Sequence, residues 1–173
     1  LLCAFLHRAS GQSCLAFGAP AHNRPTAAFK ETIGVFIETF ALQAEIADNE
    51  TFASLHQSVR REAGSFLRYA MPGASTASGH RSLSALLNYV PVTFGDFAGL
   101  SAETEWIHAG HGDAHHHVRL QVHDFDGSGE ITLALDLNAA LFDGQQREAA
   151  GDHLVALLDA MLDDETQPLA TAP

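Results

Sequence analysis

The sequence predicts an α/β sandwich, in which helices cover one face of a mixed β-sheet. Apolar or alternating segments of strand length are interleaved with longer segments in which apolar residues recur every three or four positions. Two alternating segments flank an Asp-Gly-Ser-Gly turn, which is typical of a hairpin. The predicted order is helix, strand, strand, helix, several strands, helix, and this order favours a mixed sheet packed against helices.

The first quarter of the chain predicts one helix and two strands. Leu1–Ala9 is predicted to be the end of a helix that stops near Gly11. Cys14–Pro20 is apolar and ends at proline, which predicts a buried strand. After a predicted loop at Asn23–Thr32, Gly34–Ile46 carries apolar residues on both of its faces. We therefore expect it to be a central strand.

A long amphipathic helix is predicted at Thr51–Tyr69, because its apolar residues form one stripe at helical spacing. A Gly/Ser/Pro-rich loop, Met71–Arg81, follows it. Leu83–Val90 then indicates a buried strand. Ser101–Ile107 alternates between small or aromatic residues and glutamates, which predicts a further strand.

The hairpin strands are predicted at Val118–Phe125 and Ile131–Asn138. The last helix is expected to begin at Asp143, which can form a capping box with Gln146. Residues 1–163 are thus predicted to form one structural unit. The polar, proline-containing segment Asp164–Pro173 is predicted to be a linker.

Composition excludes several classes of function. The chain has 173 residues, 46% of them hydrophobic, which suits one globular domain or a large subdomain. Its net charge of −12, with only nine Lys and Arg, argues against binding to nucleic acids or anionic membranes. No apolar run approaches the ~20 residues that span a bilayer. The cysteines, Cys3 and Cys14, are expected to be buried free thiols in a reducing cytoplasm. The low charged fraction and the missing initial Met favour a fragment whose apolar surface meets a neighbour.

Two spaced motifs lie in Phe17–Gln43, and three more follow in order. The first two comprise Gly18, Pro20 and Arg24, and then Ile33, Gly34, Phe36 and Thr39. The later motifs are TFASLHQSVR (Thr51–Arg60), LLNYV (Leu86–Val90) and LDLNAALFD (Leu135–Asp143). Together they resemble the C-terminal half of the condensation domain of non-ribosomal peptide synthetases, over nearly the whole chain.

The resemblance implies a chloramphenicol acetyltransferase-like fold and one half of a two-lobed domain. Such a domain joins a donor thioester to an acceptor amine, both tethered to peptidyl carrier proteins by phosphopantetheine arms. The implied partners are the N-terminal half, the carrier proteins and an adjacent adenylation domain. The family's catalytic motif, two His followed three residues later by Asp-Gly, belongs to the N-terminal half and is absent from this sequence. This half is therefore expected to supply a tunnel wall and part of a carrier-docking face, and no catalytic residue.

Departures from the family pattern leave other functions open. Glu38 replaces the family's Asn, Gln43 replaces its Arg, and the Pro-Phe-Glu segment after the long helix is missing. These changes suit an atypical donor or acceptor. They also suit a degenerate domain that docks a carrier protein or tailoring enzyme without catalysis. A stand-alone acyltransferase of the same fold is a third reading.

Three residues are candidates for lining the tunnel. Arg24 could lie near the tunnel or pair within a surface loop. Glu38 would be costly in a buried strand unless it faces water, a partner or the tunnel. Asn88 is expected to contribute to strand packing, with tunnel lining as the weaker alternative.

Two histidine features are not expected to be catalytic. Two residues separate His123 from Asp126-Gly127, whereas three separate the second His from Asp-Gly in the family motif. We therefore favour a hairpin turn as the explanation of this Asp-Gly pair. The segment His108–Val118 could bind Zn²⁺ or Ni²⁺, but its spacing is not that of a structural zinc site. A solvated loop, open to adventitious metals or sensitive to pH, is favoured over a physiological metal centre.

Overall fold

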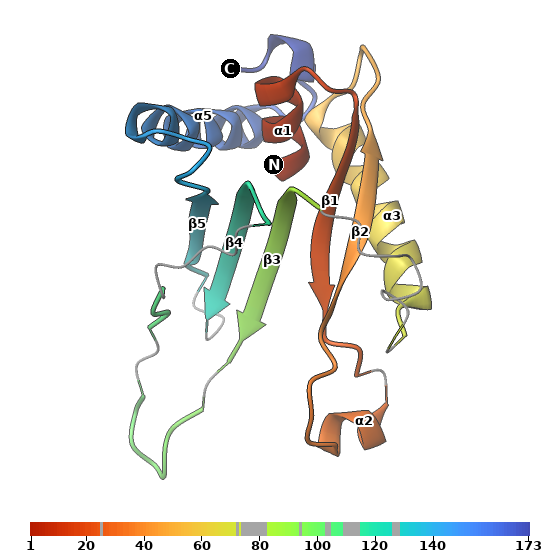
Figure 1. Cartoon of the computed structure of the whole chain (residues 1–173), viewed down its shortest axis with the longest axis vertical. Helices are drawn as coiled ribbons and strands as arrows, with labels where there is room; N and C mark the ends of the chain where they lie inside the picture. Colours follow the sequence, from red (N-terminus) through yellow and green to blue (C-terminus); the bar gives the residue numbers. More distant parts are fainter. Residues whose placement is uncertain are drawn as a thin grey trace.

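Among the residues that the structure describes, the sheet is mixed and has five strands in the order β2-β1-β3-β4-β5 (Figure 1). The computed structural model describes residues 1–24, 26–71, 73, 83–93, 95–102, 105–108, 115–125 and 129–173. The strands are β1 (Cys14–Ala21), β2 (Glu38–Glu45), β3 (Ala85–Val92), β4 (Val118–Phe125) and β5 (Ile131–Leu137). β1, β3 and β4 run parallel, while β2 and β5 pair antiparallel at the two edges. The predicted mixed sheet and the antiparallel pairing of β4 with β5 are confirmed.

The helices begin and end where local capping chemistry places them. They are α1 (Leu2–Ser10), α2 (Ala27–Glu31), α3 (Phe52–Tyr69), α5 (Gly144–Asp163) and a 3-10 turn at Leu169–Thr171. Thr51 caps α3 and Asp143 caps α5, each in a reciprocal capping box. Gly11 ends α1 with a φ of 70°, a left-handed conformation that glycine adopts at little cost. The predicted helices are therefore confirmed.

The core lies on one face of the sheet, which we call the helix-covered face. Alternate positions of each strand pack there against α1, α3 and α5. The strand residues of this core are Leu15, Phe17, Ala19, Leu42, Ala44, Ala85, Leu87, Val118, Leu120, Val122, Leu135 and Leu137. In Figure 1, α1 and α5 lie across one end of the sheet and α3 runs beside β1 and β2. At the centre of the core, Leu157 and Phe17 are 0% and 1% exposed.

Three predictions about local structure were wrong. The loop predicted at Asn23–Thr32 contains the short helix α2. The second strand starts only at Glu38 and lies at an edge of the sheet, because its apolar residues Phe40, Leu42 and Ala44 all point to the helix-covered face. In the segment predicted as a strand at Ser101–Ile107, the described residues 101, 102 and 105–107 are not in a strand.

The two cysteines are free, as predicted, and Cys3 is buried. The predicted burial of Cys14 is wrong, because this residue is exposed at the first position of β1. Burial raises the pKa of the Cys3 thiol, so this group is protonated and unreactive near neutral pH. Within the described part of the chain, no helix combines the length and the apolarity that crossing a bilayer requires.

The last ten residues, for which the sequence predicted a linker, are packed against the core. Leu169 and Ala172 are 1% and 2% exposed. The Leu169 amide donates to the Glu50 carbonyl at 2.8 Å, and Thr51 forms a β-bridge with Pro168. The Arg8 guanidinium donates to the Ala170 carbonyl at 3.2 Å. This segment therefore closes the end of the molecule where α1, α3 and α5 meet.

If the tail is part of the folded unit, Leu169→Ala will lower the free energy of unfolding by about 2–5 kcal/mol, as other large-to-small core substitutions do. Urea denaturation followed by far-UV circular dichroism measures the change. Leu162→Ala is the matched control, because Leu162 is 73% exposed and should change stability by less than about 0.5 kcal/mol. Equal stability of the two variants would show that the tail is dispensable.

Candidate functional site

The second face of the sheet, which we call the polar face, carries a connected polar cluster. Its centre is Asp136 of β5. The Asp136 Oδ2 accepts from Arg119 Nε at 2.8 Å and from Gln121 Nε2 at 3.0 Å, both from β4. The Asp136 Oδ1 lies 3.0 Å from His108 Nε2. One carboxylate thus ties the edge strand to β4 and holds segment 105–108 against the sheet.

The burial of this cluster is graded. Gln121 is 4% exposed, whereas the side chains of Arg119 and Asp136 are 22% and 24% exposed and that of His108 is 40% exposed. The ion pair is therefore partly screened by water, so its contribution to stability is modest. Its specific contribution is geometric, because three nitrogen atoms converge on one carboxylate and fix its orientation.

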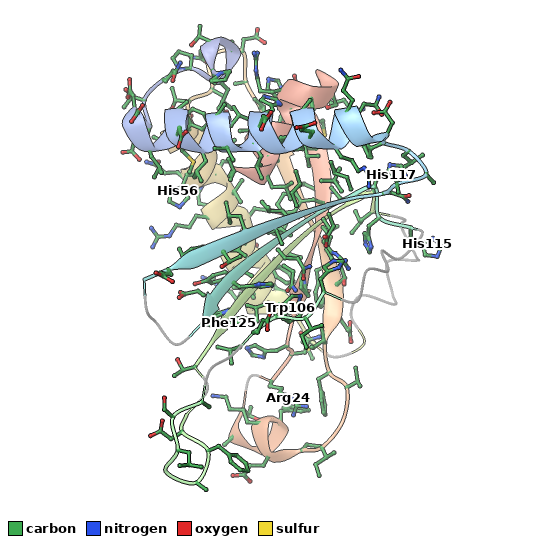
Figure 2. The ribbon with its side chains drawn as sticks, turned by 90° about the vertical axis from the view of Figure 1, so that its left-hand side faces the viewer. Arg24, His56, Trp106, His115, His117 and Phe125 are labelled. Atoms are coloured by element: carbon green, nitrogen blue, oxygen red, sulfur yellow. The ribbon has the colours of Figure 1, made fainter. Side chains whose placement is uncertain are left out.

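His123 is buried between two aromatic rings. Its ring centroid lies 4.7 Å from Trp106 and 5.1 Å from Phe125, and it stacks on Phe125 at an angle of 8°. Trp106 and Phe125 are both labelled in Figure 2. His123 is 4% exposed, and its Nε2 has no hydrogen-bond partner among the residues that the structure describes. A buried polar atom without a partner is uncommon and often marks a functional site.

His123 lies inside β4, as the predicted strand at Val118–Phe125 requires. Its backbone is in register with Val90 on β3 and Thr132 on β5. The Asp126-Gly127 pair, for which a hairpin turn was predicted, lies outside the described residues. The buried position of His123 follows from strand alternation, which puts it on the same face as Gln121.

Arg24 is bound to its own loop. Its Nη1 donates to the carbonyls of Phe29 and Thr32, the latter at 2.7 Å, and its Nη2 donates to the carbonyl of Gly34 at 2.8 Å. The guanidinium carbon also lies 4.4 Å from the centre of the Phe36 ring. Figure 2 shows Arg24 beside α2. These contacts give Arg24 a structural role, which is to hold this loop in one conformation.

The structure does not bring Arg24, Glu38 and Asn88 together. Glu38 is on the helix-covered side of β2, where its Oε1 accepts from the Gly73 amide. Asn88 is half-buried on the polar face, in register with Gln121. Asn88 is thus the one predicted candidate that lies beside the polar cluster. Trp106 and Asp136 were not among the predicted site residues. In the sequence, Trp106 is the one aromatic residue of its short alternating segment, and Asp136 is the one charged residue of its own.

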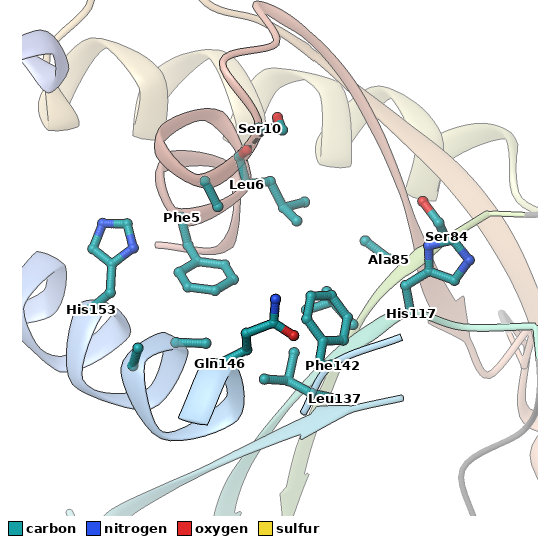
Figure 3. Close-up of a pocket in the computed structure, with 14 residues that line it drawn as sticks. Phe5, Leu6, Ser10, Ser84, Ala85, His117, Leu137, Phe142, Gln146 and His153 are labelled. Carbon is teal, nitrogen blue, oxygen red and sulfur yellow. Dashed lines mark hydrogen bonds between the residues drawn. The ribbon is translucent and has the colours of Figure 1, made fainter. Parts of the chain in front are cut away.

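The histidine-rich segment lies partly outside the described residues, which include His108 and residues 115–118. Among the described residues, no group of three His, Cys, Asp or Glu could hold a metal ion. His117 lines a cavity of about 500 Å³ on the helix-covered side, together with Phe5 of α1 and Phe142 and His153 near and on α5 (Figure 3). This cavity is predominantly apolar, and it lies across the sheet from the polar cluster.

Replacing His123 with Phe should raise the free energy of unfolding by about 1 kcal/mol, because it keeps the aromatic stack and removes the unpartnered nitrogen. Urea denaturation at pH 8 measures the effect. His123→Ala is the control and should be destabilising, since it removes the stack as well. A large loss of stability in the Phe variant would show that Nε2 does have a partner.

Comparison with known proteins supports one family. The sequence profile of the condensation domain matches residues 1–172. Over 63 residues, or 36% of the chain, the sequence is 40% identical to a component of the plipastatin synthase of Bacillus subtilis, of which the match covers 2%.

Solved structures of condensation domains share the fold. The starter condensation domain of the rhizomide synthetase RzmA aligns with 99% of the chain, at a TM-score of 0.73 and 21% identity. A mutant of that domain, in complex with C8-CoA and Leu-SNAC, gives a TM-score of 0.84 at 24% identity. The first condensation domain of the CDA synthetase gives 0.68 at 16% identity.

The chain covers 42%, 40% and 40% of these three solved chains, respectively. The predicted chloramphenicol acetyltransferase-like fold is thereby confirmed. With the mixed sheet, the helices and the profile match in agreement, the chain belongs to the condensation-domain family of non-ribosomal peptide synthetases.

Proposed function

We propose that this chain is the C-terminal lobe of a two-lobed condensation domain, and that its polar face forms one wall of the substrate cleft. In this reaction the acceptor amine attacks the carbonyl carbon of the donor thioester. An amide bond forms, the C–S bond breaks, and the thiol of the donor's pantetheine arm leaves. The amine proton passes to a base of the N-terminal lobe. The C-terminal lobe orients the reactants.

The asymmetry of the sheet is the observation that carries this proposal. On the helix-covered face, the side chains of the strands form the core and pack against the helices. On the polar face, the buried Gln121 donates to the partly exposed Asp136, which fixes this carboxylate, and Trp106 is 45% exposed. A rigid wall of this kind is suited to holding two tethered reactants in line, which can lower a barrier by ~7–11 kcal/mol.

An exposed apolar segment supports the presence of a second lobe. Ile33, Val35 and Ile37 are 101%, 94% and 63% exposed, although Arg24 holds this loop in place. Apolar side chains displayed so fully on an ordered loop are typical of a surface that another body covers. We propose that the N-terminal lobe of the same domain covers them.

The proposed partners follow from the same family membership. The donor and acceptor would arrive on the phosphopantetheine arms of peptidyl carrier proteins, within a cytoplasmic synthetase that also holds an adenylation domain. Which amino acid or acyl group is transferred depends on both lobes. The alternative function keeps the fold but lacks catalysis: the domain would dock a carrier protein or a tailoring enzyme.

In the complete domain, Trp106→Ala should slow amide-bond formation about tenfold, because the exposed ring would no longer shape the cleft. The rate is measured by mass spectrometry of carrier-bound product under single turnover. Tyr89→Ala is the matched control: this exposed aromatic lies on the opposite face of the sheet, as strand alternation places it with Leu87. The hydrogen bond to Asp124 raises the pKa of Tyr89, so the control ring stays uncharged in the assay.

Equal rates for wild type and Trp106→Ala, with unchanged stability, would contradict the cleft assignment. A complete domain that binds its carrier proteins but forms no amide bond would instead establish the docking alternative.

A further inference from the structure

Helix α3 is a rigid platform. Its inner side buries Phe52 and Leu55, and the Phe66 ring packs 4.7 Å from that of Phe40 on β2. The capping box at Thr51 fixes its first turn. The outer side of the helix is therefore presented in a defined orientation without further ordering.

That outer side carries a cluster of cations. Arg60, Arg61 and Arg68 are exposed, and Leu67 between them is 62% exposed. At 100° per residue these four positions fall on one side of the helix and span about 12 Å along its axis. Tyr69 extends the exposed apolar surface at the end of α3, at 71% exposure, and Met71 follows it at 66%. We call Arg60, Arg61, Leu67 and Arg68 the arginine face.

The three arginines of this face differ from the other arginines that the structure describes. Those others, Arg8, Arg24, Arg119 and Arg147, each donate at least one side-chain hydrogen bond. Within the described part of the chain, the arginine face makes no ion pair and no side-chain hydrogen bond. This is unexpected in a chain with 21 acidic and nine basic residues. The helix dipole accounts for a cation in the last turn, which explains Arg68 but not Arg60 or Arg61.

We propose that the arginine face binds an acidic surface helix of a partner protein. Three guanidinium groups around an exposed leucine match a helix that carries carboxylates about four residues apart beside one apolar side chain. Arginine, tyrosine and methionine are also the residues that protein interfaces favour. A polyanion such as DNA fits poorly, because the net charge of −12 would repel it beyond this small patch. This proposal is independent of the catalytic role proposed above.

The test uses the complete protein that contains this chain and a fluorescein-labelled acidic peptide. The peptide is helical, about 18 residues long, with Glu every fourth position beside a Leu stripe. Fluorescence anisotropy should show saturable binding that weakens at least about tenfold in Arg60→Glu/Arg61→Glu/Arg68→Gln. Binding should also weaken as salt rises from about 50 to about 500 mM. Lys30→Glu is the control, because Lys30 is an exposed cation on α2, away from this face; it should bind the peptide like wild type.

Circular dichroism checks that the triple variant is folded, and the milder Arg60→Gln/Arg61→Gln replaces it if it is not. Equal binding to a composition-matched scrambled peptide, or no binding at about 1 mM peptide, would overturn the proposal. So would equal or tighter binding of a DNA duplex of about 20 base pairs. A second copy of the protein is the remaining alternative partner. If the protein self-associates, and if the triple variant and Glu148→Lys/Asp152→Lys on α5 each abolish self-association, the arginine face binds a second copy and the proposal is wrong.

Discussion

The pairing register of β4 decides what each face of the sheet carries. Leu120 pairs with Leu87 of β3 and with Leu135 of β5, and all three point into the core. A slip of one residue would move Gln121 into that core and Leu120 to the polar face, because neighbouring side chains of a strand point to opposite faces. Both residues are almost fully buried, Leu120 at 2% and Gln121 at 4% exposure. The register is thus fixed from both faces, by apolar packing on one and by the Asp136 network on the other.

The two faces of the sheet have different roles, one in stability and one in the proposed chemistry. The helix-covered face supplies the buried apolar area that holds the lobe together. The polar face is kept rigid by hydrogen bonds to Asp136 and by the packing of Trp106 on His123. Arg24 likewise keeps the exposed loop rigid, because it donates hydrogen bonds to the carbonyls of Thr32 and Gly34. Each proposed contact surface is therefore organised before a partner or substrate arrives.

Features encoded locally could be predicted from the sequence. The caps at Thr51 and Asp143 depend on residues three positions apart, so both were found. The edge position of β2 and the packing of Leu169 depend on contacts with distant segments, so periodicity could not reveal them. The same holds for the polar cluster, because Trp106 and His108 reach β4 and β5 from the described residues 105–108, which are in no helix or strand. Arg24 was recognised as a site of interest, yet its partners are backbone carbonyls that no side-chain pattern identifies.

The most direct test of the cleft assignment is hydroxyl-radical footprinting of the complete condensation domain, with and without a non-hydrolysable donor thioester analogue. Mass spectrometry would compare the oxidation of Trp106 with that of Tyr89, two exposed aromatics on opposite faces of the sheet. The analogue should protect Trp106 and leave the oxidation of Tyr89 unchanged. Protection of Tyr89 alone, or no protection of Trp106 at saturating analogue, would contradict the cleft assignment.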